Sequence, residues 1–95
     1  MRVKLLGKTW ELRFCRLRTA RGDCDAPDTC SKEIRIHNGL RDEELLEVII
    51  HECRHAADWR IDESYIEREA RDLARVLWRL GYRRDDSKTL PTRGS

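Results

Sequence analysis

Residues 43–55, with the sequence EELLEVIIHECRH, decide the fold and the site that we expect in this chain. Their apolar positions recur at helical spacing, and no Pro or Gly interrupts residues 40–80. Positions four apart lie on one face of a helix, so His51 and His55 can present two imidazole nitrogens to one metal ion. Glu52 would then lie beside the open coordination position. The segment predicts a helix that carries a metal site.

The pattern His-Glu-x-x-His is the arrangement found in zinc peptidases, where the histidines bind zinc and the glutamate is the general base. It uses two of the three histidines of the chain. We therefore expect Zn2+ as the cofactor, with His51 and His55 as ligands and Glu52 as the catalytic residue. The alternative is a surface helix with two incidental histidines.

Catalytic zinc takes three protein ligands and keeps one position open, so a third ligand is needed. No histidine follows His55, which leaves an acid from a later segment. If the chain reverses near residue 60, the middle of the histidine pair lies level with Glu67 on the next helix, and we choose Glu67. Glu63, one turn earlier on the same face, is the alternative. Glu67 could also be a surface acid paired with Arg71.

The chain before this helix predicts three strands. Residues 2–6 and 10–18 flank a Gly-Lys turn, and apolar and charged residues alternate in the second of them, which predicts a β-hairpin. Residues 19–32 are rich in Gly, Asp, Pro and Ser and predict a loop. Residues 33–37 alternate again and predict an edge strand beside the metal helix.

An exposed edge strand offers unpaired backbone groups to an added strand. In zinc peptidases the strand beside the metal helix commonly receives the substrate backbone in this way. Ile34, Arg35 and Ile36 are therefore candidate substrate-binding residues. An inner position for this strand is the alternative.

A second helix follows the first after a short connection, so we expect the two to be antiparallel neighbours. Asp62 is a plausible N-cap, and Gly81 ends the apolar stripe. The predicted fold is α+β: a three-stranded sheet, made of the hairpin and one edge strand, packed on two antiparallel helices. We assign residues 1–83 to one domain and residues 84–95 to a disordered tail.

Composition sets the class of protein. Hydrophobic residues make up 39 % of the chain and charged residues 40 %, which indicates a small domain with a thin core and a charged surface. We find neither an apolar run of about 18 residues nor a signal-peptide pattern, so we expect a cytoplasmic protein with no membrane partner and with its four cysteines as free thiols. A mild basic excess in the first half is only a weak indication of nucleic-acid binding.

Several segments carry a family resemblance: residues 50–56 (IHECRHA) and 73–83 (LARVLWRLGYR), with Asp58-Trp59, Asp62-Glu63 and, more loosely, residues 34–36. In these segments the chain resembles the small zinc-peptidase-like proteins of the zincin group, in particular the short forms found in phages and prophages. The resemblance implies a minimal zincin fold, a Glu ligand on the second helix, consistent with Glu67, and the host cytoplasm if the chain is phage-encoded. It names no physiological target.

Three functions follow from these patterns. The first is a zinc metallopeptidase acting on a peptide or protein substrate, with Tyr65, Tyr82, His37 or an arginine as the donor to the oxyanion. The second is a zinc-stabilised binding module of the same fold without catalysis. The third is a nucleic-acid-associated protein that uses the arginines of residues 13–18. We expect Trp59 to be a packing residue, and the oligomeric state is left open.

Overall fold

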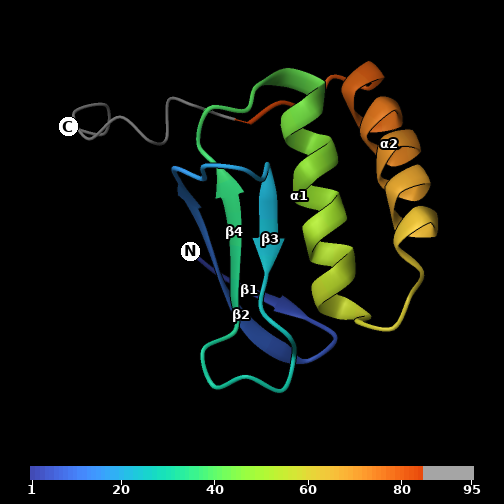
Figure 1. The fold of residues 1–95 in the computed structure, drawn as a ribbon. Helices are drawn as coiled ribbons and strands as arrows, with labels where there is room; N and C mark the ends of the chain where they lie inside the picture. The colour runs from blue at the N-terminus through green and yellow to red at the C-terminus, as the bar shows by residue number, and fades with distance from the viewer. Residues whose placement is uncertain (85–95) are drawn as a thin grey trace.

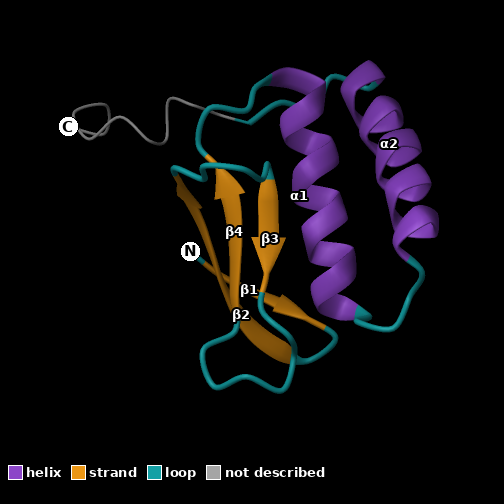
Figure 2. Ribbon diagram, viewed as in Figure 1, coloured by secondary structure: helices purple, strands orange, loops and turns teal. Residues whose placement is uncertain are grey.

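A computed structural model describes residues 1–84 as a small α+β fold (Figures 1 and 2). Its elements are β1 (Arg2–Leu5), β2 (Lys8–Cys15), β3 (Gly22–Cys24), β4 (Glu33–His37), α1 (Asp42–Ala57) and α2 (Glu63–Arg79). The α+β class and both helices are confirmed. The predicted disordered tail lies, apart from Arg84, outside the described residues.

The four strands form one mixed sheet in the order β1-β2-β4-β3. β1 and β2 are the predicted hairpin, antiparallel and closed across Leu5 and Lys8. β4 then runs parallel to β2, with Leu12 beside Ile34. β3 pairs antiparallel with β4 on the other side.

Two predictions about the sheet are wrong. It has four strands instead of three, because the expected loop over residues 19–32 contains β3, whose Gly-Asp-Cys sequence is too short and too poor in strand-forming residues to be recognised. β4 is an inner strand instead of an edge. Ile34, Arg35 and Ile36 are paired with neighbours on both sides, so their backbone is not free to receive a substrate strand.

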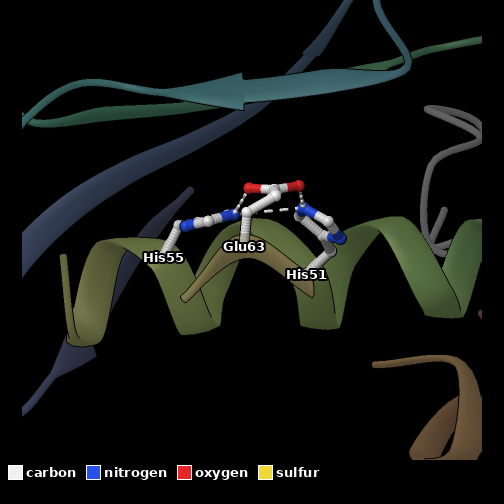
Figure 3. A group of neighbouring side chains, drawn as sticks. All are labelled: His51, His55 and Glu63. Carbon is white, nitrogen blue, oxygen red and sulfur yellow. Dashed lines mark hydrogen bonds and ion pairs between the residues drawn. The ribbon is translucent and has the colours of Figure 1, made fainter. Parts of the chain in front are cut away.

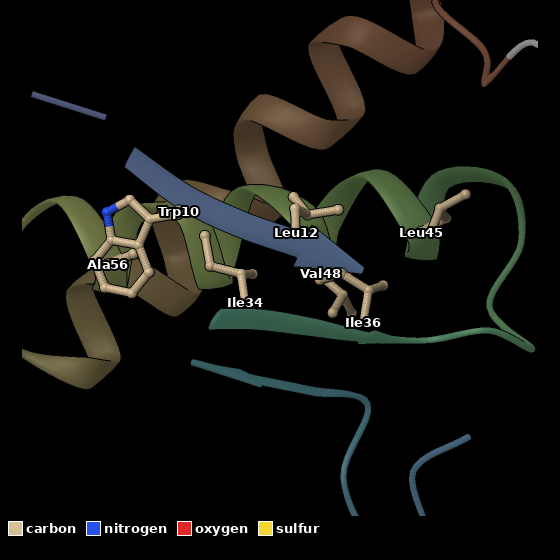
Figure 4. Packing of buried hydrophobic residues seen from close by; sticks show 7 residues of the cluster. All are labelled: Trp10, Leu12, Ile34, Ile36, Leu45, Val48 and Ala56. Carbon is tan, nitrogen blue, oxygen red and sulfur yellow. The ribbon is translucent and has the colours of Figure 1, made fainter. Parts of the chain in front are cut away.

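The core lies between the sheet and α1 (Figure 4). Alternate residues of β2 and β4 point toward the helix and are buried, which follows from the two-residue period of a strand. α1 covers them with one apolar face. The buried residues of this cluster are Trp10, Leu12, Ile34, Ile36, Leu45, Val48 and Ala56.

α2 packs against α1 and touches no strand of the described sheet, so α1 separates it from the sheet (Figure 1). Ile66, Ala70 and Ala74 are its buried residues, and the small alanines let the two helices approach closely. Neither of the two helices described is long and apolar enough to cross a membrane.

The ends of α2 are fixed by the residues that the sequence indicated. The Asp62 carboxylate accepts hydrogen bonds from the backbone N–H groups of Ser64 and Tyr65, at 3.1 and 3.2 Å, which confirms it as the N-cap. Gly81 has a φ of +97°, the left-handed conformation that commonly ends a helix. α2 therefore starts at a defined residue, Glu63.

Candidate metal centre

The two histidines of α1 and the first residue of α2 converge on one point (Figure 3). The Nε2 atoms of His51 and His55 lie 3.1 Å apart. One carboxylate spans both rings, with Glu63 Oε2 3.1 Å from His51 and Glu63 Oε1 2.6 Å from His55. The helical spacing of the motif thus brings the imidazoles together as predicted, and a carboxylate from the second helix completes the group.

The structure places Glu63, and not Glu67, against the histidines. The choice of Glu67 assumed that both helices run up to a reversal near residue 60. α1 instead ends at Ala57, and residues 58–62 form a non-helical connection that includes a turn, in which the Ile61 N–H donates a hydrogen bond to the Asp58 carbonyl at 3.2 Å. The connection runs back alongside the end of α1, so that α2 begins level with the His-Glu-x-x-His motif (Figure 1). Glu67 lies one turn further on and is 4.0 Å from Arg71, the ion pair that we considered as its alternative role.

The donor set fits zinc. Two imidazole nitrogens and one carboxylate are a ligand set of catalytic zinc sites, and they leave a fourth position open. Ligands about 2.0–2.1 Å from zinc at tetrahedral angles lie about 3.3 Å from one another. The three donor groups here are separated by 2.6–3.1 Å at their nearest atoms, so a small movement apart makes room for one ion.

Glu52 is the one buried charged side chain of the described residues, with 9 % of its surface exposed. It lies on the β3 side of α1 and lines the same cleft as the histidines. Burial, followed by the charges of Asp23 and Glu63, raises the pKa of its carboxyl to about 7. A buried carboxylate beside three groups that could hold a metal ion is the arrangement that the motif predicts.

The histidines and Glu52 open into a cleft of about 460 Å³ between β3, α1 and the start of α2. β3 can approach α1 this closely because residue 22 is glycine: a Cβ there would lie 2.8 Å from Val48 Cγ1 and 3.0 Å from Glu52 Cγ. Cys24 also lines the cleft, and burial, with the neighbouring Glu52 charge, raises the pKa of its thiol to about 12. β3 thus forms one wall of the cleft, and its edge away from β4 is a free edge of the described sheet.

Sequence reasoning missed the residues of this wall, because residues 21–24 fall in the stretch that predicts a loop. The arginine of that segment, Arg21, lines the cleft, and Trp59, expected in helix packing, is 48 % exposed at its rim. Tyr65 and Tyr82, two candidates for an oxyanion donor, lie outside the cleft. The His37 ring accepts a hydrogen bond from the Leu17 N–H at 3.1 Å.

Arg35 holds β3 in place from the other face of the sheet. Its guanidinium contacts the carboxylates of Asp23 at 2.6 Å, Asp25 at 2.8 Å and Glu33 at 2.8 Å. Hydrogen bonding to Arg35 lowers the pKa of Asp25 and of Glu33. Arg13 also pairs with Glu33, at 3.3 Å. These two arginines are therefore engaged within the sheet, and the role in nucleic-acid binding stays a prediction.

Comparison with protein families, with curated proteins and with solved structures finds no match to this chain. The resemblance to phage-type zincins therefore stays a prediction. What can be argued about function rests on the geometry of the cleft.

Proposed function

We propose that this protein is a zinc-dependent metallopeptidase. The observation that carries the proposal is the convergence of the His51 and His55 Nε2 atoms and the Glu63 carboxylate, all within 4.8 Å of one another, beside buried Glu52 in an open cleft. Zinc bound there would acidify a water molecule and polarise the carbonyl group of a peptide bond. The substrate class that we propose is therefore a peptide or an unfolded protein segment.

The residues of the chain have distinct roles in this reaction. The Glu52 carboxylate accepts the proton of the attacking water and returns it to the amine that leaves. Arg21 is the one positively charged side chain among the described residues that line this cleft; its guanidinium is paired with Glu44 at 3.0 Å and would have to leave that pair to reach the developing oxyanion. The free edge of β3 takes the place that we had assigned to β4, and its residues Gly22–Cys24 pair with the substrate backbone.

Glu52→Gln separates zinc binding from catalysis. Because Glu52 is not among the three converging donors, we expect this variant to keep zinc and to lose peptide cleavage by at least about 100-fold, the usual contribution of a general base. Zinc content and cleavage of a fluorescent peptide mixture measure the two properties. Asp72→Asn, on the other side of α2, is the matched control and should behave like wild type. Cleavage by Glu52→Gln at the wild-type rate would contradict the mechanism.

A zinc-stabilised binding module without catalysis is the second candidate. The observation that favours it is that α2 packs against α1 alone among the described elements, so a bound ion would add a link between the two helices. Both candidates bind zinc. Under this second function wild type and Glu52→Gln bind zinc equally and neither cleaves peptides.

A further inference from the structure

The cleft contains more negative charge than metal binding and catalysis use. Four glutamates of the two helices line it: Glu47, Glu52, Glu63 and Glu67. Its one guanidinium, that of Arg21, lies 3.0 Å from the Glu44 carboxylate and is partly neutralised by it. A ligand that enters this cleft therefore meets a negative potential.

Two of these four carboxylates have no function in the site described above. Glu63 faces the histidines, and Glu52 is the proposed base. Glu47 takes part in no ion pair among residues 1–84. Glu67 has only a 4.0 Å contact with Arg71, and both of these side chains are half exposed.

Glu47 and Glu67 lie at the same end of the cleft. Glu47 precedes His51 by one helical turn on α1, and Glu67 follows Glu63 by one turn on α2, each turn being about 5.4 Å. Because the helices are antiparallel, one turn forward on α2 and one turn back on α1 lead in the same direction (Figure 1). The opposite end, beside His55, carries the exposed ring of Trp59.

Glu47 and Glu67 do not form a second metal site. Among residues 1–84, the three donors at the histidine pair are the one group close enough to hold an ion, and neither Glu47 nor Glu67 belongs to it. Two separated carboxylates suit a longer cation that reaches between them, such as a lysine ammonium or an arginine guanidinium.

We propose that this acidic end of the cleft selects substrates with Lys or Arg beside the bond that is cleaved, and that Glu47 and Glu67 determine this preference. The inference rests on the proposed peptidase function. A helical turn from the metal centre is about the distance between a scissile carbonyl and the side chain of the adjacent residue. The basic side chain thus binds while the peptide bond lies at the histidines.

The test maps cleavage sites. The zinc-loaded full chain digests a reduced, unfolded protein substrate, and mass spectrometry identifies the bonds that are cut. We expect Lys and Arg to be enriched at one position next to the cut. Peptides that differ only in Lys or Gln at that position should then differ roughly three- to tenfold in kcat/KM, the effect of one or two partly exposed ion pairs.

Variants then assign the preference to the two acids. Glu47→Gln/Glu67→Gln should abolish the difference between the Lys and Gln peptides and leave cleavage of the Gln peptide unchanged. Glu43→Gln/Asp72→Asn removes the same charges from the same two helices outside the cleft, and should keep the preference. Zinc content of each variant excludes metal loss as the cause.

The outcomes separate the two proposals. Cleavage without enrichment of basic residues, or enrichment that survives in Glu47→Gln/Glu67→Gln, overturns the inference and leaves the peptidase function intact. No cleavage by the zinc-loaded wild type overturns the peptidase function and this inference with it.

Discussion

At the scale of single residues, the position of Glu63 explains the site. It is the first residue of α2, held there by the Asp62 cap, so its carboxylate has a fixed origin next to the motif. The N-terminus of a helix also stabilises negative charge. Both effects favour a carboxylate that is available to a cation at this point.

Replacing this carboxylate tests the assignment. We expect Glu63→Gln to weaken zinc binding by more than about 100-fold, beyond the roughly 10–100-fold cost of losing an outer-sphere partner. Glu67→Gln, one turn away on the same helix, is the matched control and should bind zinc like wild type. Titration against a chelator of known affinity measures both. Loss of zinc from Glu67→Gln with retention by Glu63→Gln would reverse the assignment.

Gly22 sets the distance between β3 and α1. Gly22→Ala places a methyl group 2.8 Å from Val48 Cγ1, so we expect a loss of about 1–3 kcal/mol in the free energy of unfolding, typical of overpacking. Urea denaturation measures it. The cost should shrink when Val48→Ala is added, because the clashing methyl is then gone. An equal cost in both backgrounds would show that crowding against Val48 is not the cause.

Sequence alone predicts the relative positions of residues that lie close together in one helix or strand. His51, Glu52 and His55 share a single helix, so their spacing is enough to place them. Glu63 depends on the path of residues 58–62, which no periodic pattern encodes. From sequence we chose Glu67 on the second helix, with Glu63 one turn earlier as the alternative, and the structure places Glu63 beside the histidines.

At the scale of elements, β3 is the strand that could not be predicted from the sequence. Strand patterns need several alternating residues, and β3 has three, one of which is glycine. It forms because β4 offers an edge to pair with, and because Arg35 binds carboxylates before and after the connection from β3 to β4. The hairpin and the two helices have long, regular patterns, and these were predicted correctly.

The Arg35 cluster makes the stability of this sheet edge depend on pH. The pKa values of Asp25 and Glu33 are lowered in the folded state, while unfolded Asp and Glu titrate near about 3.9 and 4.3. As the pH falls toward about 4, the carboxyl groups of the unfolded state bind protons before those of the folded state. The contribution of the cluster to stability is therefore complete above the unfolded pKa values. It is lost as the pH falls through the folded pKa values.

We therefore expect the free energy of unfolding to fall as the pH is lowered from about 5 to about 3. In this range the carboxyl groups of the unfolded chain, with pKa values of about 3.9 for Asp and 4.3 for Glu, take up protons. Arg35→Met should be less stable than wild type at pH 7, and the difference should narrow toward pH 3. Urea denaturation of both proteins across this range measures it. Parallel pH profiles would mean that Arg35 does not set the pKa values.

At the scale of the whole molecule, the fold is a sheet, a helix and a second helix attached through the first. The apolar core lies on the sheet side of α1, and α2 adds only three buried residues. The candidate metal centre lies toward the end where α1 and α2 are joined, and a bound ion would link them. Metal binding and the stability of the helix pair should therefore be linked.

Zinc should raise the melting temperature. Binding to the folded state adds about 2.7 kcal/mol when free zinc is about 100 times Kd. Differential scanning calorimetry with zinc and with a chelator measures the shift. Glu63→Gln should show a much smaller one, which controls for zinc bound by the four cysteines of the unfolded chain. An equal shift in the variant would place the stabilising zinc elsewhere.

The most direct test of the account is the zinc content of the protein purified without chelators and without a metal-affinity step, by elemental analysis followed by titration of zinc into any metal-free fraction. We expect one tightly bound zinc per chain, lost in His51→Ala. A protein that contains no zinc and takes up none on titration would contradict it, and the convergence of His51, His55 and Glu63 would then be a helical contact without a metal.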